Sequence, residues 1–407
     1  MKSLLLSTFV TVSFSASAYA LDSLSQDDLS DAVLTDYETH LLPLFQHFHQ
    51  NPELSHQEFK TATRLANELS DAGYHVTRNV GGTGVVATLK NGEGPLVMMR
   101  ADMDALPIKE QTGLPYASNI TQVNNLTGET VPVMHACGHD VHVTNLVGTA
   151  RQMARLRKHW SGTLMLIGQP AEETDSGARG MMQDNLWQRF GRPDYALAMH
   201  VLSDNKAGTI DVIDGAPGAG SDSVEITVYG VGTHGAEPHM GKDPIVLASQ
   251  IVLALQTLVS RELAPREPGV ITVGAFNAGA KNNIIPEAAH LKLTVRNTNL
   301  ETRQKLLDGI KRITINMARA AGMPDDKLPD IVFSREMTPP MVNNSGLAQR
   351  LKKVWQTKLG QEVVTSIKPQ GMGAEDFPYF TTEPYIPSVY FMVGGTPQEF
   401  FDGKRAI

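Results

Sequence analysis

Cysteine is almost absent from this sequence: Cys137 is the only one among 407 residues. No internal disulfide framework can form, so the thiol is free to act as a metal ligand. Basic residues are also sparse, because 35 Lys and Arg face 43 Asp and Glu, giving a net charge of -8. They form no cluster, and this excludes a nucleic-acid-binding surface. With 41% apolar and 19% charged residues, the composition is that of a folded, soluble protein.

Two further features are missing. The sequence contains no Gly-x-Ser-x-Gly motif, and Cys137 lacks the setting of a thiol nucleophile, so a serine hydrolase is disfavoured. Outside the N-terminal region, no apolar run suggests a membrane span. We therefore expect neither a nucleic acid nor a membrane as a partner.

The N-terminus has the pattern of an export signal. Met1-Lys2 is a short basic start, Leu4 to Ala16 is rich in apolar and small residues, and Ala18-Tyr19-Ala20 fits the rule for a cleavage site. The apolar run is too short for a permanent membrane helix. We expect residues 1–20 to be a signal peptide cleaved near Ala20, and the mature chain to be periplasmic or secreted.

The length predicts two domains. Residues 215–220, rich in Gly and Pro, have the composition of a linker, and a βαββαβ succession follows them. Its strands are expected at Ser223–Tyr229, Gly269–Phe276, His290–Arg296 and Asp330–Phe333, and its helices at Pro244–Glu262 and Leu300–Ala321. We therefore predict an inserted α+β, ferredoxin-like domain at 221–334, within a discontinuous domain of residues 21–220 and 335–407.

The outer domain is predicted to be α/β, a mixed sheet in an α/β/α arrangement. Apolar periodicity predicts helices at Gln57–Ala72, Val141–Leu156 and Ser345–Lys358, after a helical pattern that stops before Asn51. Strands are expected at His75–Val80, Gly84–Lys90, Leu96–Met99, Gly162–Gly168, Tyr195–Met199 and Ser388–Val393.

The segment from Met134 to His142 carries the first candidate site. Cys137 and His139 are two residues apart, and thiolate with imidazole suits zinc, manganese, cobalt or nickel. The alternative is a buried cysteine beside incidental histidines. We expect Cys137 and His139 in the loop before helix Val141–Leu156, and His142 in a structural role on its first turn.

Further acids and a histidine follow predicted strands. Glu172 and Glu173 come after strand 162–168, His200 follows strand 195–199, and Asp102 and Asp104 follow strand 96–99. Strand ends are where α/β proteins build sites. Each acidic pair could instead be a solvated turn. Together they predict a metal ligand beside a general base, with aspartates that orient the imidazoles.

The order of these motifs resembles the dinuclear metallo-amidohydrolases of the aminoacylase and carboxypeptidase type. The similarity is to their branch of hippurate hydrolases and indoleacetyl-amino acid hydrolases. It covers nearly the whole mature chain, from Phe48–Leu54 to Val393–Gly395. The similar segments between these are Arg100–Pro107, His135–His142, Gln169–Glu173, His200, Gly232–Ala236, Asn283–Pro286 and Ala374–Phe377.

The resemblance implies two divalent metal ions per subunit and roles for nine residues. The metal ligands would be Cys137, His139, Glu173 and His200. Catalysis would fall to Glu172 as the general base, to Asp104 as a support of the ligands, and to His234, which reaches the substrate carbonyl across a homodimer interface. The substrate carboxylate would be held by Asn283 and Arg296, a role that a guanidinium suits. The inserted domain would serve dimerisation and act as a lid.

One departure from that pattern concerns a further histidine ligand near the C-terminus. No histidine occurs after His290, so we expect the second metal site to be weak. The implied reaction is hydrolysis of the amide bond of N-acyl-amino acids or small peptides. The alternative is a metal-binding homologue with little or no catalysis, and a truncated gene product would show the same absence.

Overall fold

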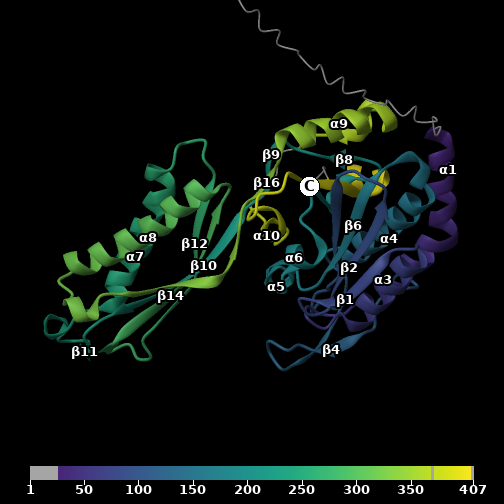
Figure 1. Cartoon of the computed structure of the whole chain (residues 1–407). Coiled ribbons are helices and arrows are strands. Elements are labelled where there is room, and N and C mark those ends of the chain that lie inside the picture. The colour runs from purple at the N-terminus through teal and green to yellow at the C-terminus, as the bar shows by residue number, and fades with distance from the viewer. Residues whose placement is uncertain (1–25, 368–370, 405–407) are drawn as a thin grey trace, which may run out of the picture.

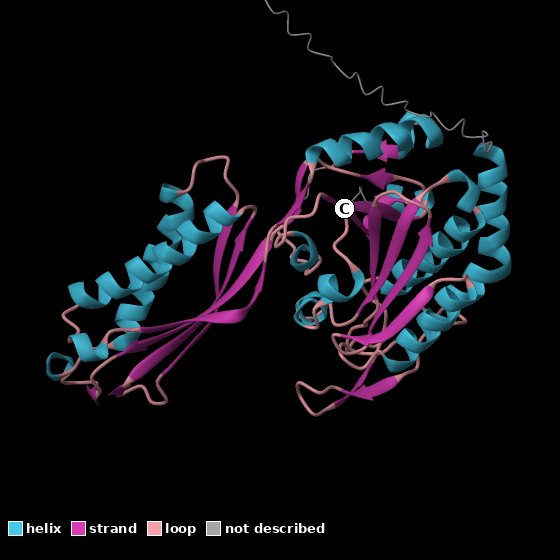
Figure 2. Cartoon of the chain, viewed as in Figure 1, coloured by secondary structure: helices cyan, strands magenta, loops and turns pink. Residues whose placement is uncertain are grey.

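The computed structural model describes residues 26–367 and 371–404, so the predicted signal peptide lies outside the described residues. The chain forms two lobes joined by a narrow pair of connecting segments (Figure 1). The larger lobe holds an eight-stranded sheet and the smaller a four-stranded sheet. Both lobes contain helices and strands (Figure 2).

The sheet of the larger lobe is mixed. Its strands run in the order β1-β2-β6-β3-β7-β18-β8-β17, and the neighbours β6, β3, β7 and β18 are parallel. The bounds are β1 His75–Val80, β2 Gly84–Asn91, β3 Leu96–Asp102, β6 Gly162–Gln169, β7 Tyr195–Lys206, β8 Ile210–Asp211, β17 Val364–Thr365 and β18 Ser388–Thr396. Parallel strands bring their carboxyl ends to one edge, which is where a site is expected.

Helices cover both faces of this sheet. One apolar core lies beneath α2 (Leu42–Gln50), α3 (Phe59–Asp71) and α4 (His139–Arg155). A separate core lies beneath α5 (Gly177–Gln183), α6 (Leu186–Phe190) and α10 (Pro378–Thr381). Further elements of this lobe are α1 Gln26–Asp36, η1 Tyr37–Leu41, β4 Thr121–Val123, β5 Thr130–Pro132, η2 Arg157–His159, α9 Ser345–Leu359, η6 Gln361–Val363 and α11 Gln398–Lys404. The predicted α/β class with a large mixed sheet is confirmed.

The smaller lobe follows a βαββαβ succession. Its four antiparallel strands are ordered β12-β14-β10-β15, and its two long helices share one core with them. The bounds are β10 Gly220–Tyr229, α7 Pro244–Thr257, η4 Leu258–Glu262, β12 Gly269–Ala278, β14 Ala288–Asn297, α8 Leu300–Ala320 and β15 Asp330–Thr338. A short pair, β11 (Thr233–His234) and β13 (Ile284–Ile285), completes it. This is the strand order of a ferredoxin-like unit.

The segment 215–220, predicted as a linker, lies where the two lobes join and is ordered as strand. Residues Gly215–Gly218 form β9, which pairs with β16 (Met341–Asn343), and β10 begins at Gly220. A Cβ on Gly220 would lie 2.8 Å from Asn297 Oδ1 and 2.9 Å from Pro340 N. Glycine is needed there because backbones approach closely where the lobes join. The predicted boundary at 334 falls inside β15.

Helix α7 with η4, Pro244–Glu262, is long and apolar enough to cross a membrane by length and composition alone. Its residues Leu247, Ala248, Ile251 and Leu255 instead pack into the core of the smaller lobe. About a third of this apolar stretch is buried (33%), so the sheet beneath accounts for only one face of the helix.

Candidate metal and catalytic site

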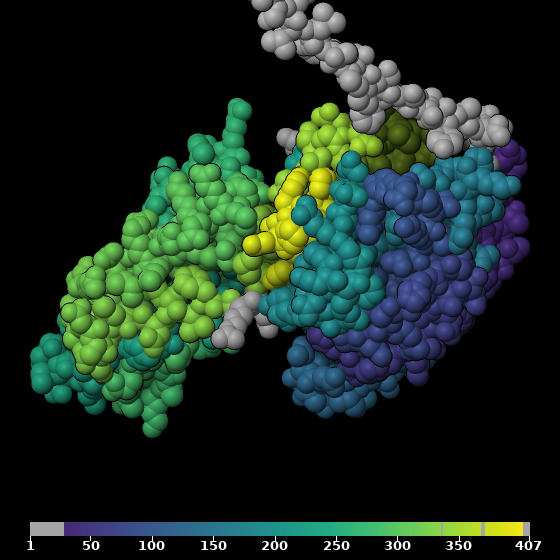
Figure 3. Space-filling view, viewed as in Figure 1, coloured from purple at the N-terminus to yellow at the C-terminus, as the bar shows by residue number. Residues whose placement is uncertain are grey.

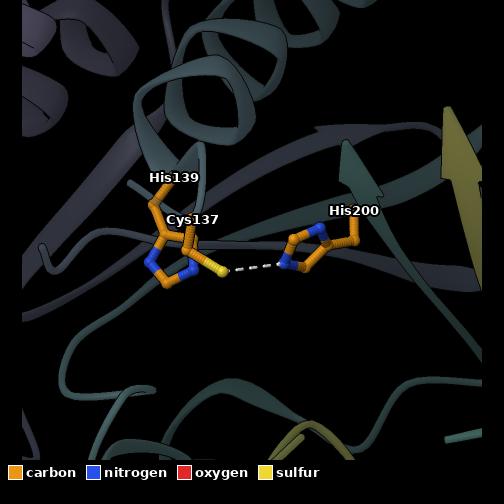
Figure 4. A group of neighbouring side chains, drawn as sticks. All are labelled: Cys137, His139 and His200. Carbon is orange, nitrogen blue, oxygen red and sulfur yellow. Dashed lines mark hydrogen bonds between the residues drawn. The ribbon is translucent and has the colours of Figure 1, made fainter. Parts of the chain in front are cut away.

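The predicted ligands from three separate segments meet beside the carboxyl ends of β3 and β6. Cys137 Sγ lies 3.4 Å from His200 Nε2, although the residues are 63 apart in sequence (Figure 4). His139 Nε2 lies 3.8 Å from Glu172 Oε2 and 3.9 Å from Glu173 Oε1. The structure therefore brings all four predicted ligands and the predicted base together.

Two of these residues sit elsewhere in their elements than the sequence suggested. His139 is the first residue of α4 and not part of the preceding loop. Gly138 permits this turn, with a φ of 87°, and a Cβ there would lie 2.5 Å from Val201 Cγ1. His200 lies inside β7 and not at its end. The strand continues past His200 because β18 pairs with it as far as Lys206.

Hydrogen bonds fix the tautomers of both histidines. His139 Nδ1 donates to the carbonyl oxygen of Asp104 at 2.8 Å, and His200 Nδ1 donates to the carbonyl oxygen of Val201 at 2.7 Å. A carbonyl can only accept, so Nδ1 carries the proton in each neutral ring. The lone pair of each Nε2 therefore points into the cluster, as a metal ligand requires.

Asp104 supports two of the ligands directly. Besides its carbonyl, its Oδ2 accepts a hydrogen bond from the amide of Glu173 at 3.1 Å and from Ser55 Oγ at 2.6 Å. Its side chain is fully buried. The predicted supporting role of Asp104 fits these contacts, because they fix both His139 and the backbone of Glu173.

A buried ionic network behind the ligands was not foreseen as part of the site. Arg100 donates to Asp102 at 2.6 Å, to Glu375 at 2.6 Å and to Asp376 at 3.3 Å. Asp102 also bonds His142 Nδ1 at 2.5 Å. The sequence predicts that Asp102 orients the imidazole of a metal ligand, whereas the imidazole that it bonds is that of His142. Glu375 and Asp376 were recognised only as part of a motif. Arg100 and Glu375 are 275 residues apart, so no local sequence pattern could predict their pairing.

Burial and neighbouring carboxylates shift the pKa values of the cluster, and burial lowers the pKa of His200 to about 4. Burial, together with nearby Glu375, raises the pKa of Glu172 well above its ordinary value, and burial also raises the pKa of Glu173. Burial opposes protonation of His139, but Asp102 and Asp104 outweigh it and raise the pKa of His139. Acids and an imidazole that all hold protons more tightly mark a pocket suited to positive charge.

The residues present fit divalent metal ions. His139 Nε2 and Glu173 Oε1 are buried without a hydrogen-bond partner in the described part of the chain. Ligand atoms of Cys137, His139 and His200 lie within 4.8 Å of one another, as do those of His139, Glu172 and Glu173. One thiol, two imidazoles and carboxylates form a donor set typical of zinc and its neighbours.

The three predicted site residues of the smaller lobe lie in two separate places. His234 and Asn283 are neighbours, because Gly235 N donates to the Asn283 carbonyl at 2.8 Å and β11 pairs with β13. Arg296 lies near the other end of β14, opposite Ser221 at the junction of the lobes. The β11 end of this lobe points away from the larger lobe (Figure 1). Within one chain, His234 and Arg296 are therefore at opposite ends of the lobe.

A cavity of about 720 Å³ adjoins the ligands. Cys137, Glu172, Glu173 and His200 form one wall, and Gly218 and Met341 of the connecting strands form another. Phe401 of α11 also lines it, and the space-filling view shows yellow atoms of the last part of the chain between the lobes (Figure 3). This volume suits a small-molecule substrate.

Comparison with known proteins agrees with this chemistry. Residues 98–406 match the family model described as peptidase family M20/M25/M40. The chain is 37% identical to the hippurate hydrolase of Campylobacter jejuni, over 82% of each chain. It is also 37% identical to the IAA-amino acid hydrolase ILR1-like 2 of Arabidopsis thaliana, over 85% of this chain and 74% of that protein.

Two solved structures share the fold across most of the chain. An aminohydrolase described from methicillin resistant Staphylococcus aureus is 30% identical, with a TM-score of 0.82 over 92% of this chain and 91% of that one. The YXEP protein of Bacillus subtilis, described as a dinuclear metal binding peptidase of the M20 family, is 29% identical. Its TM-score is 0.73, over 88% of this chain and 89% of that one.

Proposed function

Because this chain belongs to peptidase family M20/M25/M40 and is a metal-dependent hydrolase of amide bonds, we propose that its substrates are N-acyl-amino acids or small peptides. The relatives named for hippurate and for IAA-amino acids support this class. So does a cavity large enough for such a molecule. The predicted signal peptide supports action outside the cytoplasm.

The observation that carries the mechanism is the position of Glu172. Its Oε2 lies 3.8 Å from His139 Nε2, and Glu173 Oε1 lies 3.9 Å from the same nitrogen. We assign Cys137, His139, Glu173 and His200 as the residues that hold two divalent ions, such as zinc, manganese, cobalt or nickel. When bound, such ions lower the pKa of a water and polarise a carbonyl.

In this mechanism Glu172 moves the proton. Its carboxylate takes a proton from the attacking water and passes it to the leaving amine nitrogen. Asp104 keeps His139 in the required tautomer through its carbonyl and holds the Glu173 backbone. Arg296, at the junction of the lobes, binds the substrate carboxylate.

His234 acts across a homodimer in this proposal. It lies on the β11 end of the smaller lobe, which points away from the larger lobe in its own chain (Figure 1). The partner subunit's His234 and the partner subunit's Asn283 would complete the site. The exposed apolar side chains Ile245, Val246 and Leu253 of α7 support a contact surface on this lobe.

The test of function is turnover of a panel of substrates by the full chain. Benzoyl-glycine, acetyl-amino acids and dipeptides are offered to protein loaded with zinc, manganese, cobalt or nickel. We expect Glu172→Gln to keep its metal content and to lose at least about a hundredfold in rate. Glu93→Gln is the control, since its side chain is 97% exposed. Absence of turnover on the whole panel would overturn the proposed substrate class.

The test of the dimer mixes two inactive variants. In a heterodimer of Glu172→Gln with His234→Ala, one site has an intact base and receives His234 from its neighbour. About a quarter of wild-type activity should return if subunits exchange at random in a symmetric dimer. Failure to recover activity after subunit exchange would contradict the role in trans.

A further inference from the structure

The segment 53–58, just before α3, contacts two of the segments that carry the site, the end of β3 and the loop after β6. Ser55 Oγ donates to Asp104 Oδ2 at 2.6 Å. His56 Nε2 lies 2.9 Å from Ser176 Oγ, and Glu58 Oε1 accepts from the amide of Ala171 at 2.8 Å. A single stretch of chain thus ties the end of β3 to the loop after β6.

Ala171 directly precedes Glu172 and has an unusual backbone. Its φ is 49°, in the left-handed region that residues with a Cβ avoid. The residue is fully buried, and such a conformation costs on the order of 1 kcal/mol or more unless its surroundings enforce it. The turn fixes the direction in which Glu172 and Glu173 leave β6.

Glu58 is held in place by neutral donors only. Besides Ala171, its partners are the amide of His56 at 2.9 Å and Thr83 Oγ at 2.5 Å. It is fully buried, and burial together with Asp104 raises the pKa of Glu58 to about 7. A carboxyl group kept in so unfavourable a place is a candidate for a functional role.

The loop after β6 is also held at both of its ends by one residue, Asp376. Asp376 accepts from Gln169 Nε2 at 2.5 Å and from the amide of Ala178 at 2.9 Å. Between these anchors, Glu58 is the side chain that binds the Ala171 amide. Removing it would leave a buried N–H without a partner at the strained residue.

We propose that Glu58 is a positioning residue that holds the Ala171 turn and so sets the direction of Glu172 and Glu173. It touches neither substrate nor metal in this role. The inference rests on the proposed functions of Glu172 and Glu173, and it adds a support that comes from the segment before α3 and not from the metal-binding segments.

The experiment compares three variants of the full chain. Glu58→Ala removes the acceptor, whereas Glu58→Gln keeps a carbonyl oxygen for the Ala171 amide. Glu53→Ala is the matched control, because Glu53 is a buried glutamate of the same segment that binds the amides of Lys60 and Thr61 instead. Each variant is measured for kcat and KM, for metal affinity by calorimetry, and for amide hydrogen exchange in residues 169–178.

For Glu58→Ala we expect kcat to fall about ten- to a hundredfold, as for other groups that support metal ligands. KM should stay nearly unchanged, metal affinity should drop, and exchange in 169–178 should quicken. Glu58→Gln should recover most of kcat. Glu53→Ala should lose stability while its kcat and its exchange in 169–178 stay at wild-type values.

Unchanged exchange and metal affinity in Glu58→Ala would overturn the inference, as would an equal loss of kcat in Glu53→Ala. If Glu58→Ala does not fold, Thr83→Val tests the same contact by removing the hydroxyl that holds Oε2, and unchanged exchange there would also overturn it. Exchange and metal binding are read without substrate, so a wrong substrate class would not hide the result.

Discussion

His49 Nδ1 lies 2.6 Å from Asp140 Oδ2, and Asp140 follows the proposed ligand His139 directly. The other ring nitrogen of His49 lies 3.0 Å from Glu110 Oε1. A buried imidazole between two carboxylates is stabilised in its charged form. The contact between His49 and Asp140 thus joins α2 to the first turn of α4.

This arrangement predicts how stability depends on pH. The hydrogen bond to Asp140 raises the pKa of His49 to about 9, despite burial. Because the folded-state pKa lies above the ordinary value of 6.5, the stabilisation is full below about pH 6.5 and is lost as pH rises to about 9. Relative to His49→Asn, the wild type should gain up to about 3 kcal/mol at low pH. Urea unfolding across pH 6 to 10 measures this difference.

His47 on the same helix provides a control of opposite sign. Burial lowers the pKa of His47, so the stabilisation from His47 is present above the ordinary pKa and is lost as pH falls. The difference between wild type and His47→Asn should therefore shrink toward low pH, where that for His49→Asn is largest. If the stability differences of the two variants changed with pH in the same direction, the opposite pKa shifts assigned to His47 and His49 would be refuted.

Arg100 should be among the most costly charged residues to replace. It is 1% exposed, and Arg100→Met leaves Asp102, Glu375 and Asp376 buried without their cation. Removing one partner of a buried ion pair typically costs about 3–5 kcal/mol. Arg303→Met in the smaller lobe breaks a pair with Asp222 alone, with Arg303 21% exposed, and should cost less. Equal losses in urea unfolding would contradict this view of the network.

Local sequence patterns predicted which helices and strands are present better than they predicted where each one ends. Strand Gly162–Gly168 and helix Leu300–Ala321 were placed within a residue, because their apolar periodicity is unbroken and their ends carry turn residues. The strand at 195–199 was predicted to end just before His200. Pairing with β18 carries β7 to Lys206, which is a tertiary effect that no local pattern contains.

The candidate ligands could be proposed from the sequence because their motifs are short and chemically distinctive, as with Cys137 and His139. Apart from Asp104, the residues that support them could not. Glu58 meets Ala171 from 113 residues away, and Arg100 meets Glu375 from 275 away. A buried glutamate before a helix has the same sequence signature as an exposed one. Only the packing of α3 against the sheet makes it part of the site.

Cys137 should be a ligand and not only a core residue. Cys137→Ala removes the thiol that lies 3.4 Å from His200 Nε2, so the affinity for one ion should fall by at least about tenfold. Cobalt-loaded wild-type protein should show a thiolate-to-metal absorption band that the variant lacks. Calorimetric titration of metal-free protein gives the affinity, and an unchanged titration with an unchanged spectrum would remove Cys137 from the ligand set.

The last prediction separates two neighbouring histidines whose rings lie 4.6 Å apart, His142 and His200. Both nitrogens of His142 are engaged, since Nδ1 bonds Asp102 at 2.5 Å and Nε2 accepts from the amide of Val201 at 2.9 Å. His200 has only Nδ1 engaged by the backbone, which leaves Nε2 for a metal. We therefore expect His142→Asn to lower stability while the number of bound ions stays the same, and His200→Asn to lower that number. Elemental analysis after dialysis against trace metal counts the ions, and urea unfolding of the metal-free forms gives the stability. Loss of an ion from His142→Asn, with none lost from His200→Asn, would reverse the assignment of the two residues.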